Sequence, residues 1–418
     1  MSRNTFVYLG SYSLSLLGNG IASVLFPLLV LAKTGDILAA GILASVTAGV
    51  AAVVGVLAGV LVDRVNRRTV SIISDVLSAG SVAALPVVDA LWGLNLTWFI
   101  VLGVIGAFGD MPGMTARETM LPRVALLGGG KPGALDRLVG VRESLSAVLM
   151  LIGPGVGGLL VYLLGVSSAA LFITAGTSLA AAVLSFAISP RAGEIESTVV
   201  AGAEHSGGVR RLFADLVAGW RFLLGSRLVL GATIVTAVFI AVLAALQATV
   251  LPAYFSREQL PELSGFAVTG IALGSLVGAG VYTAMIGRTS RRAWFVIGIV
   301  GSMIGFVALG TLGAPWMVIV AAVLIGLTNA PMSAVLGVAT IEATPDRMRG
   351  RVLGAQNALM LAAPALTSAP IAAVASGFGL TAAGIGIAVL MAVTGVIALV
   401  APAFRGLDTI EPSNEQEG

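Results

Sequence analysis

Residues 59–68 read Gly59-Val60-Leu61-Val62-Asp63-Arg64-Val65-Asn66-Arg67-Arg68, and two long apolar runs, 38–62 and 69–88, flank this charged stretch. One crossing of a bilayer takes about 20 apolar residues in helical form. Such runs must be helical because hydrocarbon offers no hydrogen-bond partner to an open backbone. The pattern therefore predicts two membrane spans joined by a short basic loop.

Ten further apolar runs of similar length follow the same pattern along the chain. Of the 418 residues, 57% are hydrophobic and 10% are charged, whereas an ordinary soluble chain carries roughly 25% charged residues. This composition excludes a water-soluble globular protein. We expect an all-α membrane protein with twelve transmembrane helices. The other ten predicted spans are 6–32, 95–116, 138–162, 165–189, 228–252, 263–286, 293–312, 315–339, 352–376 and 379–403.

The two halves of the chain resemble each other. A shift of 224 residues places Arg67 on Arg291 and Arg68 on Arg292, which indicates two parallel repeats with a substrate path at their interface. The predicted division is a six-helix half at 1–189, a cytoplasmic linker at 190–227, a second six-helix half at 228–403 and a cytoplasmic tail at 404–418. Within the linker, the spacing of apolar residues over 209–224 favours an amphipathic helix on the membrane surface or, alternatively, a solvated linker helix.

Basic residues predict the orientation. If the N-terminus is cytoplasmic, only Lys33 and Arg257 of the 23 Lys and Arg residues fall in outer loops. The positive-inside rule then predicts that both termini are cytoplasmic and that the protein is a multi-pass protein of the cytoplasmic membrane. This placement also accounts for the basic isoelectric point near 9.6 without nucleic acid. The chain contains no Cys and a single His, His205, so thiol chemistry and a histidine proton relay are excluded.

The stretch 59–68 closely resembles the cytoplasmic signature of the major facilitator superfamily. In that family the motif latches the cytoplasmic side shut in the outward-open state, and the resemblance implies this role for Asp63, Arg64, Arg67 and Arg68. We expect Gly59 to allow close helix contact and Asp63 to face the positive end of a helix dipole. The arginines and Asp75 are expected to bridge between helices, with Arg64 or Arg68 as the partner of Asp75. The alternative is a loop that is basic for topology alone.

A glycine-rich run in the fifth span, Gly153-Pro154-Gly155-Val156-Gly157-Gly158, resembles the signature of the exporter branch of the superfamily. Pro154 removes a backbone donor, and Gly153, Gly157 and Gly158 allow a neighbouring helix to approach. A generic glycine-rich helix contact is the alternative interpretation. Together with residues 114–122 and 349–352, these motifs resemble the branch that holds Tap-type multidrug, macrolide and enterobactin exporters. In the Tap-type group acids commonly occupy the first and seventh spans, where this chain has Asn19 and Gln247.

Carboxyl groups inside apolar helices are candidates for proton coupling, because each charged one costs about 2.5–3.5 kcal/mol at mid-span unless it is paired or faces water. Asp75, Asp110, Glu118 and Glu143 lie within such helices, with Asp75 expected as a bridging partner of the loop arginines, and Asp110 lies nearest the predicted middle of a span. An acid in apolar surroundings can bind a proton on one side and release it on the other. Glu143 is alternatively an ion-pair partner of Arg142, and Glu118 a partner of loop arginines.

The expected function is export of amphipathic small molecules by proton antiport with alternating access. No ATP-binding motif and no nucleophile or metal constellation occurs in the sequence, so neither an enzyme nor a cofactor is predicted. Proton-coupled uptake of a metabolite, and export of a siderophore or lipid-like metabolite, are alternatives. We expect substrate, protons and membrane lipid as partners, and the resemblance implies a monomer. The polar groups predicted to line the substrate cavity are Asn19, Arg142, Gln247, Asn329 and Asn357.

Overall fold

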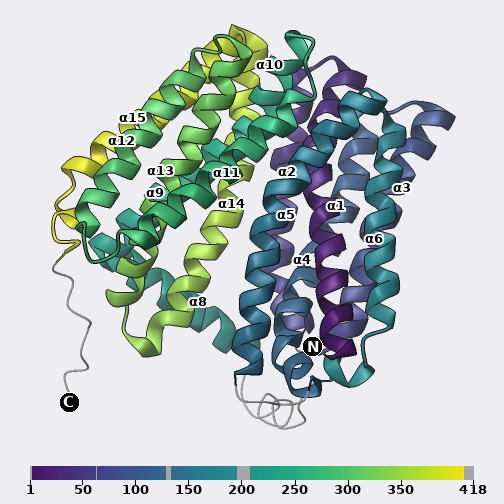
Figure 1. Ribbon diagram of the computed structural model, residues 1–418, viewed down its shortest axis with the longest axis horizontal. Helices are drawn as coiled ribbons and strands as arrows, with labels where there is room; N and C mark the ends of the chain where they lie inside the picture. The colour runs from purple at the N-terminus through teal and green to yellow at the C-terminus, as the bar shows by residue number, and fades with distance from the viewer. Residues whose placement is uncertain (1, 63, 129–132, 195–207, 409–418) are drawn as a thin grey trace. The chain divides into compact units, whose positions relative to one another are not determined.

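The computed structural model describes residues 2–62, 64–128, 133–194 and 208–408, and this part of the chain is helical throughout, without strands (Figure 1). Within these described residues, twelve helices are long and apolar enough to cross a membrane. They coincide with the twelve predicted spans, so the prediction of an all-α membrane fold is confirmed. Large apolar side chains such as Trp92, Phe108 and Tyr162 are exposed on these helices, as expected of surfaces that face lipid.

The chain divides into two compact units. The first is built from the described residues of Met1–Ala203 together with Gln247–Thr269. Its helices are α1 (Arg3–Thr34), α2 (Ile37–Val62), α3 (Arg67–Trp92), α4 (Leu96–Leu127), α5 (Ala134–Leu164), α6 (Leu171–Phe186) and α10 (Leu251–Arg257), with short 3-10 turns η1 (Ser168–Ala170) and η2 (Pro190–Gly193) and the start of α11.

The second unit contains the described residues of Glu204–Leu246 and Gly270–Gly418. Residues 195–207, which include His205, and the tail from 409 lie outside the described residues. The predicted roles of 190–227 and 404–418 stay predictions. The helices are α8 (Gly208–Gly225), α9 (Arg227–Ala245), most of α11 (Leu263–Ala284), α12 (Arg291–Gly310), α13 (Pro315–Glu342), α14 (Asp346–Phe378) and α15 (Leu380–Val400).

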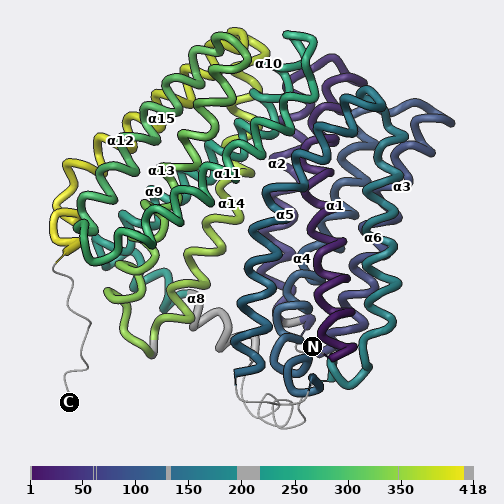
Figure 2. Tube along the Cα trace, viewed as in Figure 1, coloured from purple at the N-terminus to yellow at the C-terminus, as the bar shows by residue number. Residues whose placement is uncertain are grey.

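In the first unit α1 packs along both α5 and α6, as the Cα trace also shows (Figure 2). Its side chains Ile21, Leu25 and Leu28 are almost fully buried and form a core with Leu85 of α3 and Phe99 of α4. Polar caps begin several of the helices: the Asn66 side chain accepts from the backbone N–H groups of two residues in the first turn of α3. The helix ends are therefore encoded locally, whereas the core is assembled from distant segments.

The fourth helix is longer than predicted. The apolar run ends at residue 116, but α4 continues to Leu127. The extension begins with Arg117, whose side chain is only 6% exposed because it is paired with an acid of α3. A neighbouring countercharge thus lets a charged residue remain inside the helix bundle, which hydropathy alone does not reveal.

Another departure from regular helix occurs before α10. Residues Leu246–Val250 form a π-helical turn immediately ahead of Pro252. Pro252 has no backbone N–H and cannot continue the normal ladder, which accounts for a local change of pitch. Turns of this kind inside α-helices frequently occur at functional sites. Gln247, a predicted cavity residue, lies within this turn.

Candidate transport site

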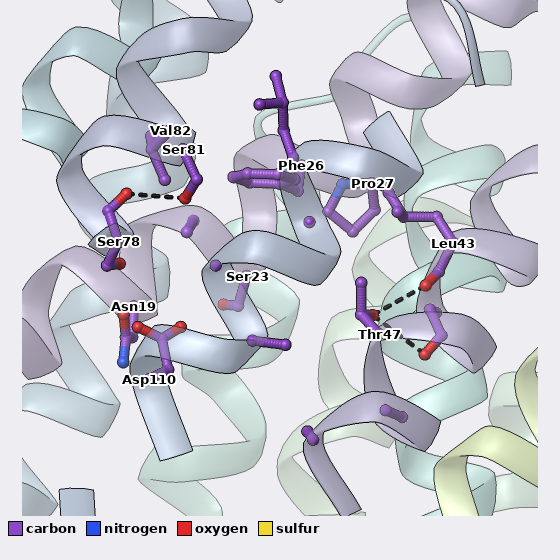
Figure 3. Close-up of a pocket in the computed structure, with 18 of the residues that line it drawn as sticks. Asn19, Ser23, Phe26, Pro27, Leu43, Thr47, Ser78, Ser81, Val82 and Asp110 are labelled. Atoms are coloured by element: carbon purple, nitrogen blue, oxygen red, sulfur yellow. Dashed lines mark hydrogen bonds between the residues drawn. The ribbon is translucent and has the colours of Figure 1, made fainter. Parts of the chain in front are cut away.

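A cavity of about 410 Å³ lies in the first unit. Residues of α1, α2, α3 and α4 form most of its wall, with Thr174 of α6 and Ala248 of the π-helical turn completing it. Figure 3 shows Phe26 and Pro27 at one end, and Asn19 next to Asp110 at another. The volume lies within the usual range for small-molecule pockets. The polar side chains that line the cavity are Asn19, Ser23, Thr47, Ser78, Ser81, Asp110 and Thr174.

Asp110 is the one carboxylic acid among these lining residues. It projects from α4, and the side chains of Asn19 and Ser78 lie beside it (Figure 3). The two charged groups that interact with Asp110 are Asp75 and Arg117. Thr174 adds a hydroxyl oxygen that is buried and has no hydrogen-bond partner among the described residues. The cavity therefore combines apolar walls with one ionisable group and free hydrogen-bonding capacity.

Asp75 has a different partner from the one that the sequence suggested. The sequence grouped it with Arg64 and Arg68, but in the structure its carboxylate binds the guanidinium group of Arg117. Asp75 is 3% exposed and Arg117 is 5% exposed. Arg117 Nη1 also donates to Ser15 Oγ at 3.0 Å. This buried ion pair ties α1, α3 and α4 together.

Arg142 of α5 forms ion pairs with the other two candidate acids, Glu118 and Glu143. Its guanidinium group lies 2.8 Å from Glu143 Oε1 and 3.4 Å from Glu118 Oε1, and it stacks over the ring of Tyr12. The side chains of Glu118 and Glu143 are more than half exposed. None of these three residues lines the cavity of Asp110. Their proposed roles in coupling and substrate binding stay predictions, and the ion-pair interpretation of Glu143 matches the observed contact.

Arg67 and Arg68 at the start of α3 bind backbone carbonyl groups. Arg67 Nη1 donates to Thr119 O at 3.1 Å. Arg68 donates to the carbonyl oxygens of Ser185 and Phe186, at 3.1 and 2.6 Å. The last carbonyl groups of a helix have no partner within the helix and carry partial negative charge, so they attract cations. Arg68 thus caps α6.

Two of the predicted latch residues, Gly59 and Arg64, lie away from other helices, and Asp63 lies outside the described residues. Arg64 is exposed, and no described atom outside the local backbone of α2 lies within 4 Å of the position that a Cβ at Gly59 would occupy. The helix contact expected at Gly59 is absent from this arrangement of the described residues, and the latch stays a prediction.

The second unit carries its own version of the arginine contact. Arg291 forms two hydrogen bonds with the Glu342 carboxylate, at 2.5 and 2.9 Å. The shift that places Arg67 on Arg291 also places Glu118 on Glu342. The repeat offset of 224 residues is therefore the sequence signal that could have indicated this pair. Asp408 further accepts from the backbone N–H groups of Arg291 and Arg292.

The glycine run of α5 allows very close packing. A Cβ added at Gly153 would lie 2.9 Å from the Cα of Gly20 in α1. A Cβ at Gly158 would lie 2.6 Å from the carbonyl oxygen of Glu262, next to Gly265 at the start of α11. Only residues without a side chain fit at these points. Gly157 packs in the same way on Ile21, and Pro154 lies against Gly265.

The remaining predicted cavity amides lie elsewhere. In the second unit the Asn329 side chain bonds to Ser333 within α13, and Asn357 is exposed. The neighbouring Gln356 is buried and donates to Thr233 Oγ1 at 2.5 Å. Of the five amide and arginine residues predicted for the cavity, the wall contains only Asn19, and Ala248 lies next to Gln247. Sequence reasoning missed Ser78 and Thr174, because hydroxyl groups occur widely in membrane helices.

Metal binding finds no support in the described residues, among which no group of three or more His, Asp or Glu side chains is arranged to hold an ion. Twelve helices of the described residues that can cross a membrane, together with a largely apolar cavity lined by one acid, indicate a multi-pass membrane protein of the transporter class. The model of the Major Facilitator Superfamily matches residues 8–264 and 241–417. The chain belongs to this family, and it is a transporter, not an enzyme.

Two relatives of this chain carry names that describe them as exporters. The multidrug efflux pump Tap of Mycolicibacterium fortuitum is 32% identical over 396 residues, which is 94% of each chain. The enterobactin exporter EntS of Escherichia coli O9:H4 (strain HS) is 26% identical over 403 residues, covering 89% of this chain and 88% of EntS. These similarities place the chain among the exporters of the superfamily and confirm the resemblance to the Tap-type branch.

Solved structures of transporters share the fold. The nucleoside transporter NupG superposes with a TM-score of 0.74 at 14% identity, covering 97% of this chain and 99% of NupG. A D-xylose-proton symporter reaches 0.67 at 14% identity, covering 96% of this chain and 98% of the symporter. Identities this low establish the fold alone. The fold therefore does not decide the direction of transport or the substrate.

Proposed function

We propose that this transporter exports amphipathic, drug-like small molecules across the cytoplasmic membrane in exchange for protons, by alternating access. The observation that carries the proposal is the cavity of about 410 Å³ with Asp110 as its only lining carboxylic acid. Apolar walls built from Ala, Gly, Leu, Val and Phe select by shape and apolar contact. A single ionisable group supplies a site at which substrate and proton compete.

The charge state of Asp110 depends on what occupies the cavity. A carboxylate near mid-membrane costs about 2.5–3.5 kcal/mol when it is neither paired nor hydrated. A bound proton removes this cost, and so does a substrate that brings a polar or cationic group to the carboxylate. The empty carrier therefore returns with Asp110 protonated. Substrate arriving from the cytoplasm or the inner leaflet displaces the proton.

Different observations support the proposed direction of transport and the proposed orientation in the membrane. The glycine run of α5 resembles the exporter signature, and the relative with 32% identity is named a multidrug efflux pump. Of the 23 Lys and Arg residues only Lys33 and Arg257 lie on the outer side if both termini are cytoplasmic. The proposed location is the cytoplasmic membrane, with an inward path for protons and an outward path for substrate.

A second candidate function is export of a siderophore or related metabolite. The likeness to the enterobactin exporter EntS favours it. Both candidates share the membrane location and direction of transport and differ in the substrate. A transport panel that includes a catechol siderophore beside lipophilic drugs separates them.

Transport by inverted membrane vesicles tests the proposal. With an inside-acid gradient, vesicles that contain the wild-type protein should accumulate substrate from a panel of fluorescent amphipathic drugs. Asp110→Asn should lower gradient-driven accumulation at least about tenfold, because it removes the proton acceptor. Glu258→Gln is the matched control and should retain transport, since Glu258 is exposed and lies outside the cavity. Substrate accumulation in right-side-out cells would instead establish uptake.

The latch is tested separately in an efflux-deficient host. We expect Asp63→Asn to lower resistance to transported drugs while surface expression stays at the wild-type level. Equal resistance of the variant and the wild type would refute the latch role that the resemblance implies for Asp63.

A further inference from the structure

Helix α3 has its polar side buried and its apolar side exposed, the reverse of a helix in a soluble protein. On the exposed side Ile73, Val76 and Leu77 are 52%, 47% and 41% exposed. On the buried side each turn from residue 71 to residue 81 carries at least one polar residue, among buried apolar ones such as Val70 and Val82. This polar stripe consists of Ser71, Ser74, Asp75, Ser78 and Ser81, which are 0%, 5%, 3%, 7% and 5% exposed.

The polar stripe connects the cavity to one end of α3. Ser78 and Ser81 line the cavity beside Asp110, and Asp75 lies one turn before Ser78. At a rise of 1.5 Å per residue, the ten residues from Ser81 to Ser71 cover about 15 Å. That length is about half of the hydrocarbon thickness of a bilayer. The stripe therefore reaches from the cavity towards the end of α3 that carries the loop 63–66.

Two buried polar atoms mark that end. Ser71 Oγ and Arg67 Nε are buried without a hydrogen-bond partner among the described residues, and they lie one turn apart on the same face. Buried polar groups without a protein partner are normally satisfied by ordered water. Water at these two atoms would continue the row of polar groups from Asp75 to the helix end.

The opposite end of the stripe is closed. One turn beyond Ser81 comes Leu85, which is fully buried together with Phe99. Asp89 follows at the far end of α3, where it binds Lys33 at 2.7 Å. An apolar layer therefore separates the cavity from that end of the helix. A path along α3 leads from the cavity in one direction only.

We infer that the buried face of α3 is a proton path between Asp110 and the cytoplasm, with Asp75 as a relay and hydrated Ser71 and Arg67 as its exit. This inference rests on the proposed function of Asp110. The proton leaves a carboxyl oxygen of Asp110, passes through the Ser78 hydroxyl, which gives up one proton as it accepts another, and binds Asp75. Asp75 then releases it to water beside Ser71 and returns to its ion pair.

The charges around the path are consistent with one mobile proton. The groups that face the stripe from α4 are Asp110 and Arg117, and the Tyr8 hydroxyl of α1 donates to the Arg117 carbonyl oxygen at 3.0 Å. Helix α6, which also packs on α3, contains no titratable residue. Asp75, Asp110 and Arg117 are neutral together when one proton is bound, and Arg67 adds a positive charge at the exit. Transfer of the proton from Asp110 to Asp75 moves the negative charge from Asp75 to Asp110, whose charge also interacts with Arg117.

Time-resolved infrared spectroscopy of the purified full chain in nanodiscs tests the path without a substrate. After a jump to alkaline pH, the carbonyl band of the protonated Asp110 carboxyl group should disappear, and Asp110→Asn assigns that band. Ser71→Val and Ser71→Thr have the same bulk and differ in the hydroxyl group. We expect the band to decay at least about tenfold more slowly in the Val variant than in the Thr variant, to the same end point.

The control is Thr69→Val, which removes a hydroxyl group from an exposed position of the same helix and should leave the decay rate unchanged. If Ser71→Val does not fold, Ser71→Ala, which adds no bulk, replaces it and should slow the decay about threefold. Equal rates in the Val and Thr variants, or in Ser71→Ala and the wild type, would overturn the path and leave the proton-carrier role of Asp110 intact. A wild-type spectrum without an Asp110-dependent band would overturn that role itself, and the path with it.

Discussion

The guanidinium group of Arg117 lies buried against the carboxylate of Asp75, and neither residue is more than 5% exposed. The two residues are 42 positions apart and belong to different helices. Because both charges have left water, each depends on the other for compensation. The pair occupies the point at which the cavity acid, the polar stripe of α3 and the end of α4 meet.

Removal of either partner of this pair should destabilise the protein strongly. Asp75→Ala or Arg117→Ala leaves one buried charge without compensation, at a cost of about 3–5 kcal/mol. The double variant Asp75→Leu with Arg117→Leu should be more stable than either single variant. Thermal unfolding of the detergent-solubilised protein measures the effect, and Arg64→Ala, at an exposed position, is the control. If the loss of stability in the double variant equalled the sum of the losses in the two single variants, the two charges would not compensate each other.

The ion pair at the other end of α3 should contribute much less. Lys33 Nζ lies 2.7 Å from Asp89, but the Lys33 side chain is 35% exposed. Exposed pairs typically contribute about 0.2–1 kcal/mol, and salt screens them. We expect Lys33→Gln to change the unfolding temperature only slightly, and less at high salt. If Lys33→Gln lowered the unfolding temperature as much as Arg117→Ala, the Lys33–Asp89 pair would have to be effectively buried.

The contact between Gly20 and Gly153 should not tolerate a methyl group. A Cβ at Gly20 would lie 2.8 Å from the Cα of Gly153, which belongs to the backbone and cannot move aside cheaply. Gly20→Ala should therefore cost about 1–3 kcal/mol through overpacking. Gly176→Ala is the matched control in α6, because a Cβ there meets no atom within 4 Å. Thermal unfolding of the two variants, measured side by side, tests this. The unfolding temperature of Gly20→Ala should lie below that of the wild type, and that of Gly176→Ala should lie above it.

Replacement of Arg291 by Lys should destabilise the protein nearly as much as complete removal of its contact with Glu342. Arg291 holds both oxygens of Glu342, and an ammonium group cannot reproduce this planar fork. We expect Arg291→Lys to lower the unfolding temperature nearly as much as Arg291→Ala. Arg288→Lys is the control at an exposed position of the preceding turn. Full retention of stability in Arg291→Lys would show that charge alone maintains the contact.

The amino-acid sequence by itself determined the twelve spans and the similarity to exporters of the superfamily. The reason is local: each apolar run of about 20 residues must form a helix in lipid whatever its neighbours are. The same local logic identified Asp110 as a candidate, since it follows Gly109 within an apolar run. The apolar run 95–116 covers only part of the fourth helix, because the countercharge that holds Arg117 in the bundle comes from another helix.

Only the tertiary structure decided which polar groups meet. Asp75 binds Arg117 and not a loop arginine, and Arg68 reaches the Ser185 carbonyl group 117 positions away. These partnerships depend on how each helix is rotated and how far it is shifted along its neighbour, and spacing along one chain does not specify either quantity. The serines of α3 are visible in the sequence, but only the packing of α4 and α6 on α3 buries them as a polar stripe inside the helix bundle.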